Sequence, residues 1–363
     1  MQNDYFPSEK VSAIRDFIAR ATHVVILTHM SPDGDAMGSA LAMYHYLVES
    51  GRTKDKRLTA HVVVPNAFPN FLAWMPGADS VIIYDEQADR ADALLAEADL
   101  VICTDFNDPK RIGRVGERMM EKTCPKILID HHLHPVDFAD VTLSYPASPS
   151  ASELVYRLII SLSGESGLSG ENGLAVATAI YTGMMTDTGN FSFNSCHPEM
   201  YEILADLVRL GVNKDAVYNA VFNAYSADRM RLMGYCLYRK MRIFPEHHAA
   251  LIYLSRKELY RFRFQSGDAE GIVNLPLQIN DVYYSCFMRE DKIEPHERER
   301  AGKAKSKIKI SFRSQGDRPV NIFAAEHFHG GGHANAAGGE FFGTVNEAVQ
   351  EFLDHYPEYF RQD

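Results

Sequence analysis

The stretch Thr-His-Met-Ser-Pro-Asp-Gly-Asp-Ala-Met-Gly-Ser (residues 28–39) decides the fold. It follows the apolar run Val24–Leu27, which predicts a buried strand, and it precedes a segment with helical periodicity. Between strand and helix it supplies His29, Asp33 and Asp35. Because a helix N-terminus attracts anions and carboxylates bind cations, this turn is predicted to bind metal ions and phosphate together.

Strands and helices alternate along the chain beyond this stretch. Strand-like runs are predicted at His23–Thr28, Ala60–Val64, Val81–Tyr84, Leu100–Thr104 and Lys126–Ile129. This alternation is typical of a mostly parallel sheet covered by helices, in which ligands bind at the carboxyl ends of the strands. Asp105 directly follows one of these strands and Asp130-His131-His132 follows another. We therefore expect both clusters at the same sheet edge as the first.

The second half of the chain predicts a change of architecture. Residues 150–241 have a helical pattern that ends in a long helix at Ala227–Met241, the length of a connector between domains. Three further strands are expected at His248–Leu254, Asp281–Met288 and Lys307–Arg313. An exposed loop is expected at Glu290–Ser306, and a helix at Val345–Tyr356 closes the chain. The prediction is an α/β protein with an N-terminal domain (residues 1–225), a helical linker (226–245) and a smaller C-terminal α/β domain (246–363).

Composition excludes several classes of protein. The net charge of −11 argues against a duplex-DNA binder, which is usually basic. Five cysteines without a CxxC pair are typical of a reducing compartment. The chain lacks a signal-peptide pattern and an apolar run of the ~20 residues that a membrane span requires. A cytoplasmic protein that does not bind membranes is expected.

The candidate ligands combine carboxylates and imidazoles without thiolates: His29, Asp33, Asp35, Asp105, His131, His132 and Asp187. Such a set suits Mn or Fe better than structural zinc. A single Asp or His after a strand is more often a turn or capping residue, but three clusters at successive strand ends favour metal binding. Four neighbouring aspartates repel one another unless cations neutralise them. We therefore predict two metal ions, the apparatus of in-line attack on phosphorus.

These motifs resemble those of the DHH phosphoesterase superfamily. The resemblance rests on His-x-x-x-Asp-x-Asp from His29, on Asp105, on Asp130-His131-His132 and on Asp187. The segment Gly330-Gly-Gly-His-Ala-Asn-Ala-Ala-Gly338 is similar to the glycine-rich signature of the DHHA1 substrate domain. In combination with the chain length, these motifs identify a member of the nanoRNase/pAp-phosphatase branch.

The resemblance implies a role for each ligand. One metal ion would take His29, Asp33 and Asp105. The second would take Asp35, Asp105, His131 and Asp187, with Asp105 bridging the two ions. The implied cofactors are two Mn²⁺, with Mg²⁺ or Co²⁺ as alternatives. Asp130 would orient His132, and His132 would face the substrate phosphate as a hydrogen-bond donor or proton source.

The C-terminal domain is expected to bind the substrate phosphate. The consecutive glycines let backbone N–H groups approach a phosphate, with Gly331, Gly332 and His333 as the expected contacts. Arg313 matches the arginine that precedes this motif in the family and offers a bidentate fork. The substrate is expected in a cleft between the domains, with a hinge near residues 226–246.

The implied reaction is hydrolysis of short oligoribonucleotides (nanoRNA) to mononucleotides and of 3′,5′-bisphosphonucleosides such as pAp. Two alternatives stay open: a cyclic di-AMP or pApA phosphodiesterase, and a nucleotide sensor without catalysis. The sequence does not rank these substrates. It also does not determine the oligomeric state, and a homodimer is one possibility.

Overall fold

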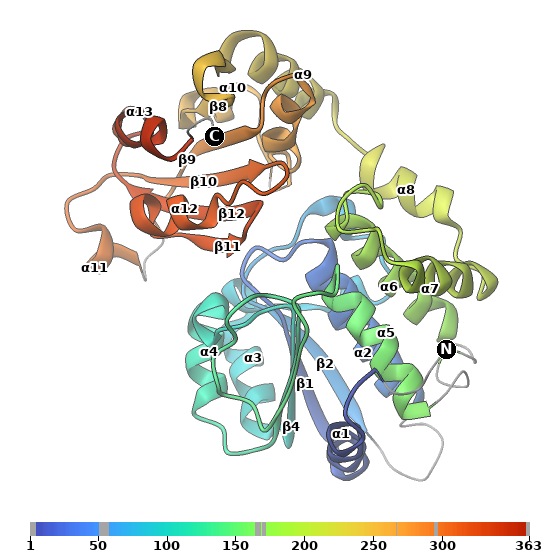
Figure 1. Ribbon diagram of the computed structural model, residues 1–363. Helices are drawn as coiled ribbons and strands as arrows, with labels where there is room; N and C mark the ends of the chain where they lie inside the picture. The colour runs from blue at the N-terminus through green and yellow to red at the C-terminus, as the bar shows by residue number, and fades with distance from the viewer. Residues whose placement is uncertain are drawn as a thin grey trace. The chain divides into compact units, whose positions relative to one another are not determined.

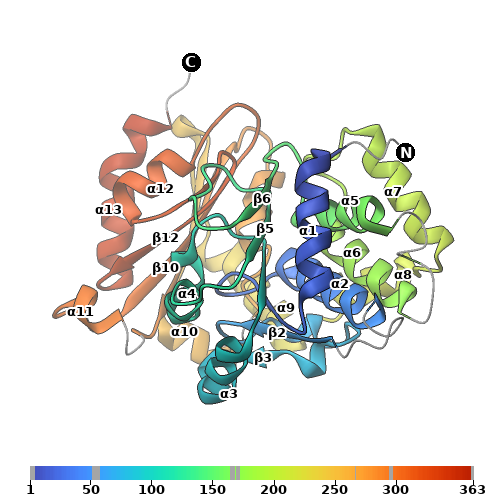
Figure 2. The same ribbon diagram turned by 90° about the horizontal axis from the view of Figure 1, so that it is seen from below.

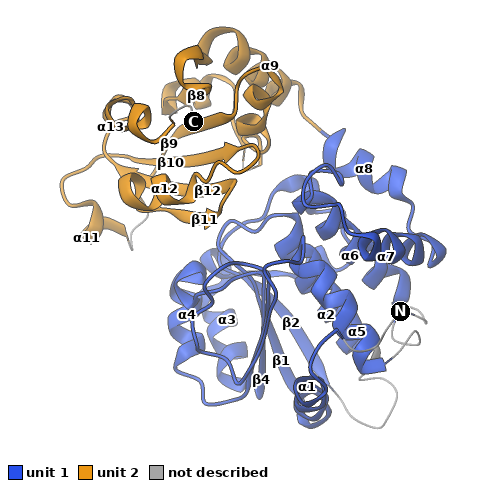
Figure 3. Cartoon of the chain, viewed as in Figure 1, with its two compact units in different colours: residues 1–224 blue, residues 225–363 orange. Residues whose placement is uncertain are grey.

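The computed structural model describes residues 5–50, 58–163, 168, 172–265, 267–293 and 297–360. The chain forms two compact units, Met1–Ala224 (unit 1) and Tyr225–Asp363 (unit 2), which are coloured separately in Figure 3 and labelled by element in Figure 1. Each unit has its own sheet and its own apolar core. The predicted α/β fold, with a parallel sheet in the first part and a second sheet after it, is confirmed.

Unit 1 is built on a six-stranded sheet in the order β3-β2-β1-β4-β5-β6. All neighbouring strands in it are parallel. The strands are β1 (His23–Leu27), β2 (Thr59–Val64), β3 (Ile82–Ile83), β4 (Leu100–Thr104), β5 (Lys126–Asp130) and β6 (Val141–Ser144). The five strands that the sequence predicts here are present, β3 in shortened form, whereas β6 was not predicted.

Helices cover both faces of this sheet (Figure 2). They are α1 (Ser8–Arg20), α2 (Gly34–Ser50), α3 (Tyr84–Glu97), α4 (Gly113–Met120), α5 (Ala151–Ser163), α6 (Gly173–Asp187), α7 (Pro198–Arg209) and α8 (Lys214–Phe222). Alternate side chains of β1 enter two cores: Val24 and Ile26 pack with α1, α2, α5 and α6, and Val25 and Leu27 pack with α3 and α4. Burial on both faces explains why this strand is apolar throughout.

Unit 2 contains a second six-stranded sheet in the order β11-β12-β10-β9-β8-β7, antiparallel except for the pair β8–β9. Its strands are β7 (Arg242–Phe244), β8 (Ala249–Leu254), β9 (Tyr284–Asp291), β10 (Lys307–Ser314), β11 (Gly331–His333) and β12 (Ala336–Phe342). Its helices are α9 (Ala227–Tyr235), α10 (Arg256–Arg261), α11 (Arg298–Ala301), α12 (Asn321–Phe328) and α13 (Val345–Tyr359). Helices α12 and α13 pack on one sheet face, and α9 and α10 on the other.

Residues 226–245, predicted as a linker, form α9, a π-helical turn at Cys236–Lys240 and β7. Leu232 and Cys236 share an apolar cluster with Ile252 of β8, so this segment packs as part of unit 2.

One prediction for unit 2 is wrong in its detail. The segment Glu290–Ser306 is not simply an exposed loop, because β9 extends to Asp291 and α11 forms within it. Glu297 at its centre is buried and makes an ion pair with the equally buried Lys307. Among the described residues, no helix has the length and apolar character needed to cross a membrane.

Candidate metal centre

The order of the strands in unit 1 reverses between β1 and β4, and such a reversal opens a crevice at the carboxyl ends of the strands. His29 lies in the loop after β1, and Asp105 directly follows β4. Both side chains are buried at this edge. The topology therefore places the first two predicted clusters at the position where a parallel sheet binds ligands.

The loop between β1 and α2 is held in shape by Asp33. Its Oδ1 accepts hydrogen bonds of 3.0 Å from the backbone N–H groups of Asp35 and Ala36, which closes the first turn of α2. Gly34 starts this helix where a Cβ would lie 2.2 Å from Thr186 Oγ1 of α6. The glycine thus lets the N-terminus of α2 approach the end of α6, the helix that carries Asp187.

Asp35 is fixed by a different helix. Its two carboxylate oxygens accept hydrogen bonds from the backbone N–H groups of Ala151 (2.6 Å) and Ser152 (2.9 Å) at the start of α5. The side chain is almost fully buried. A carboxylate held at a helix N-terminus is favoured by the unpaired N–H groups there, and it keeps a fixed orientation.

Asp105 occupies the centre of the site. Its backbone is left-handed, with φ of 63°, a conformation that costs energy for a residue with a side chain and that often occurs at functional sites. Its Oδ2 lies 3.3 Å from His29 Nε2, and its Oδ1 lies 3.4 Å from His131 Nε2. The two oxygens of one carboxylate therefore face two different histidines, the arrangement that a bridging ligand requires.

Backbone carbonyls orient both histidines. His29 Nδ1 donates to the carbonyl of Met30 (2.9 Å), and His131 Nδ1 donates to that of Ser148 (3.1 Å). Each ring therefore turns its Nε2 toward the carboxylates. This is the usual outer contact of a metal-binding histidine.

Two groups of potential ligands result, and they meet at Asp105. The first group is His29, Asp33 and Asp105, and the second is Asp35, His131 and Asp187. Within each group the ligand atoms lie within 4.8 Å of one another. In the second group, His131 Nε2 is 3.4 Å from Asp187 and 3.8 Å from Asp35. The structure thus brings together, from four separate segments, the six residues that the family resemblance implies as metal ligands.

The electrostatics of the site reflect its crowded carboxylates. Burial alone would lower the pKa of His29, but its contacts with Asp105 and Asp33 raise it to about 10. The pKa of His131 is likewise well above its ordinary value because Asp187 and Asp105 outweigh burial. Burial and repulsion from Asp105 raise the pKa of Asp35 well above the usual range. The raised pKa values of both imidazoles reflect the negative charge of the surrounding carboxylates, and this negative charge attracts cations.

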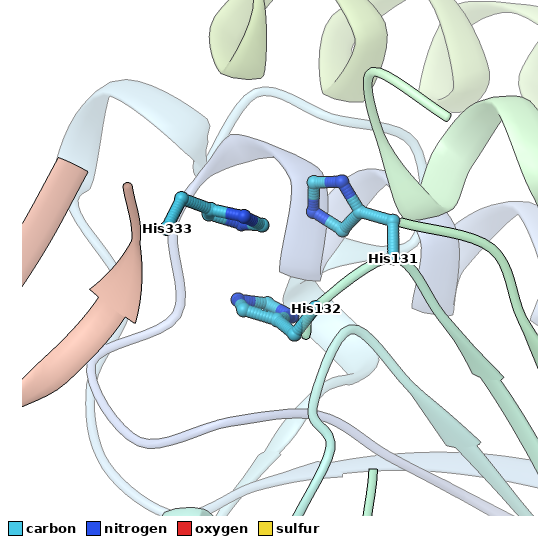
Figure 4. A group of neighbouring side chains, drawn as sticks. All are labelled: His131, His132 and His333. Atoms are coloured by element: carbon cyan, nitrogen blue, oxygen red, sulfur yellow. The ribbon is translucent and has the colours of Figure 1, made fainter. Parts of the chain in front are cut away.

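His132 lies beside His131 but has a different partner (Figure 4). Its Nδ1 is 2.7 Å from Asp130 Oδ1, and its backbone N–H donates to Asp130 Oδ2 (3.1 Å). Asp130 is fully buried and so forms a rigid support. Burial of His132 outweighs the influence of Asp130 and lowers the pKa of the imidazole.

One residue near this site was not predicted. Arg111 lies in a short 3-10 helix (Pro109–Ile112) after β4, and its carbonyl accepts a hydrogen bond from Met30 N–H (2.9 Å). Its positive charge lies close enough to His132 to contribute to the lowered pKa of that imidazole. The sequence holds no distinctive signal for Arg111, because only the folded loop brings it beside the residues after β1.

Two of the predicted substrate residues of unit 2, Arg313 and His333, lie in one row of its sheet. Ala336 of β12 pairs with Arg313 of β10 on one side and with His333 of β11 on the other (Figure 4 labels His333). Residues directly opposite one another point to the same sheet face, so the guanidinium and the imidazole belong to one face. Gly331 and Gly332 precede His333 on β11, an edge strand.

The donor set of unit 1 fits two divalent cations. Asp105 Oδ1 is buried and makes no hydrogen bond, a costly state for a carboxylate oxygen that a metal contact would relieve. The groups combine carboxylates with imidazole nitrogens, which suits Mn²⁺ or a similar ion.

Known proteins share this arrangement of sequence and fold. The model of the "DHH family, N-terminal domain" matches residues 23–184. A crystal structure of an exopolyphosphatase-related protein from Bacteroides fragilis is 44% identical over 98% of both chains, with a TM-score of 0.87.

Two more distant relatives have named activities. The bifunctional oligoribonuclease and PAP phosphatase NrnA of Thermus thermophilus is 28% identical, over 91% of this chain and 88% of that protein. The cyclic-di-AMP phosphodiesterase GdpP of Geobacillus thermodenitrificans is 23% identical, over 96% of this chain and 49% of that protein.

Proposed function

Because the chain belongs to the DHH family of phosphoesterases, we propose that it is a two-metal enzyme that hydrolyses short oligoribonucleotides and 3′,5′-bisphosphonucleosides such as pAp. One observation carries this proposal: both oxygens of the buried Asp105 face separate groups of ligands, and one of these oxygens lacks a hydrogen bond. A binding protein without catalysis has no need for two metal groups that share a carboxylate.

The metal ions would be held by the two groups that meet at Asp105. When bound, two divalent cations supply charge neutralisation at the phosphoryl oxygens and an activated water for in-line attack. The chain itself orients the ligands: the N-terminus of α5 fixes Asp35, and backbone carbonyls fix the tautomers of His29 and His131. Little rearrangement of these side chains is then required during reaction.

His132 is proposed to act on the substrate and not on a metal ion. With Nδ1 held by Asp130, its Nε2 is the ring nitrogen proposed to contact a phosphoryl oxygen or to give a proton to the leaving oxygen. Asp130 keeps the imidazole oriented through the hydrogen bond to Nδ1, and its other oxygen accepts from the backbone N–H of His132. Asp105 acts beside this pair as a metal ligand.

Arg111 is proposed to bind a substrate phosphate. Replacing it by alanine is expected to raise KM for pAp about tenfold or more while kcat changes little, because a hydrogen bond to a charged group contributes roughly 1.5–3 kcal/mol. The matched control is Arg114→Ala, since Arg114 lies on the neighbouring helix and its guanidinium packs over the Tyr84 ring. A KM for Arg111→Ala equal to that of the control would refute this role.

Unit 2 is proposed to contribute Arg313, Gly331, Gly332 and His333 to substrate binding. Gly331→Ala tests this contribution, because a Cβ at residue 331 meets no atom within 4 Å and the fold should tolerate it. The methyl group would obstruct a phosphate that approaches the backbone, so KM should rise about tenfold at an unchanged Tm.

Gly234→Ala is the control for this variant, since residue 234 is equally open and lies in α9. Alanine there should leave KM unchanged and should stabilise the helix by up to ~1 kcal/mol. If Gly331→Ala keeps the KM of the Gly234→Ala protein, the glycine segment does not bind phosphate.

The substrate itself is tested by direct comparison. The Mn²⁺-loaded protein would be assayed with pAp, a short RNA, pApA, cyclic di-AMP and, given the relative from Bacteroides fragilis, inorganic polyphosphate. The proposal expects the highest kcat/KM for pAp or the short RNA. A preference for cyclic di-AMP or pApA would favour the activity named for GdpP, and no hydrolysis of any of them would favour a nucleotide sensor.

A further inference from the structure

A second group of potential metal ligands lies in unit 2, within its helical layer. His327 belongs to the last turn of α12, and Glu351 and His355 are one turn apart on α13. These two helices pack side by side on the same face of the sheet, in the red part of Figure 1. One ligand atom from each of the three residues lies within 4.8 Å of the other two.

The spacing of these side chains fits a shared ion. His327 Nδ1 and Glu351 Oε1 form a long hydrogen bond of 3.4 Å, compared with the 2.7–2.9 Å of a charge-assisted hydrogen bond. Two ligands that each lie 2.0–2.2 Å from a tetrahedral ion are separated by roughly 3.3–3.5 Å. The observed distance matches this value.

His355 has the outer contact of a metal-binding histidine. Its Nδ1 donates to the carbonyl of Glu351 (2.9 Å), one helical turn earlier, and lies 3.4 Å from Glu351 Oε1, so that Nε2 would be the nitrogen that binds an ion. Its ring centroid is 4.2 Å from that of His327.

From this geometry we infer that unit 2 binds one Zn²⁺ ion, or a similar borderline cation, through His327, Glu351 and His355. Two imidazoles and one carboxylate are a typical zinc set, and three protein ligands leave a fourth position for water. The side chains are 17%, 33% and 40% exposed, so the ion can enter from solvent. The site is distinct from the carboxylate-rich centre of unit 1 and does not depend on the proposed reaction.

The ion would join α12 to α13 just before the glycine segment. Gly330 N–H donates to the carbonyl of Ala324 in α12 (2.9 Å), and β11 begins at the next residue. A cation at His327 would therefore stabilise the end of the helix from which the Gly331–His333 strand continues. Bound zinc should raise the stability of the folded chain by mass action.

The test measures zinc binding to the full-length protein and to three variants. His327→Ala and His355→Ala each remove one ligand, and His197→Ala is the control because it removes an exposed histidine from unit 1. After equilibrium dialysis against Zn²⁺, wild type and His197→Ala should hold one more zinc ion per chain than the two ligand variants. Mn²⁺-dependent hydrolysis by all four proteins should be equal.

Co²⁺ supplies a second readout that is independent of activity. A four-coordinate site with two imidazoles gives intense visible absorption, whereas an oxygen-rich, six-coordinate site absorbs weakly. Wild type should show the intense band, and Glu351→Gln, which preserves the shape of the side chain, should lose it. Equal zinc content in all variants, or an intense Co²⁺ band in Glu351→Gln, would overturn the inference.

Discussion

Asp105→Asn is expected to lose at least about 10³-fold in kcat/KM, which corresponds to about 4 kcal/mol of transition-state stabilisation. The reason is geometric: Asp105 is the residue whose two oxygens face both ligand groups, at 3.3 Å from His29 and 3.4 Å from His131. An amide cannot offer two anionic oxygens, so both ions should bind more weakly. Asparagine tolerates the left-handed backbone at this position, and the fold should therefore be retained.

Asp108→Asn is the matched control for this variant. Asp108 lies in the same loop, and its side chain caps a 3-10 helix by accepting a hydrogen bond from Lys110 N–H. Asparagine caps helices equally well, so activity and metal content should equal those of wild type. Metal content by elemental analysis and initial rates with pAp measure both properties. Wild-type rates in Asp105→Asn would refute the assignment of the metal centre.

The second large effect is expected for His132→Ala, a loss of about 10²–10⁴-fold in kcat. Metal content should stay at the wild-type level, because His132 is held by Asp130 and is proposed to face the substrate. If it protonates the leaving oxygen, the loss should be much smaller for a substrate with a p-nitrophenolate leaving group, which needs no proton.

The measurement compares kcat for pAp with kcat for bis(p-nitrophenyl) phosphate in wild type and in His132→Ala. Asp130→Asn should also lower kcat, but by less than His132→Ala, since it disturbs only the orientation of the His132 imidazole. An equal loss on both substrates would assign His132 to phosphate binding in place of proton transfer. Loss of metal from His132→Ala would make it a ligand and would contradict the proposed role.

Much of unit 1 follows from local sequence, because its strands are buried on both faces. A fully apolar run such as Val24–Leu27 has few alternatives to a central strand. Helix α8 begins at Lys214 because the Asn213 side chain supplies its N-cap. The ligands could be nominated because each follows a strand or helix end, but their convergence at Asp105 depends on the strand order, which the sequence does not specify.

Other features depend on tertiary contacts that leave little trace in the sequence. Strand β12 starts with alanine and glycine, which have low strand propensity, and it forms because it pairs with β10 and β11. Arg111 reaches the site through a backbone hydrogen bond to Met30. His327 and Glu351 are separated by 24 residues and meet only because α12 packs against α13.

The central claim is that two metal ions share Asp105, and electron paramagnetic resonance of bound Mn²⁺ tests it most directly. Mn²⁺ would be titrated into the chelator-treated protein while pAp hydrolysis is followed in parallel. The account predicts that the spectrum of a spin-coupled Mn²⁺ pair and the activity rise together in wild type, and that both are absent in Asp105→Asn. Full activity with isolated Mn²⁺ signals alone, or with no metal bound, would contradict it.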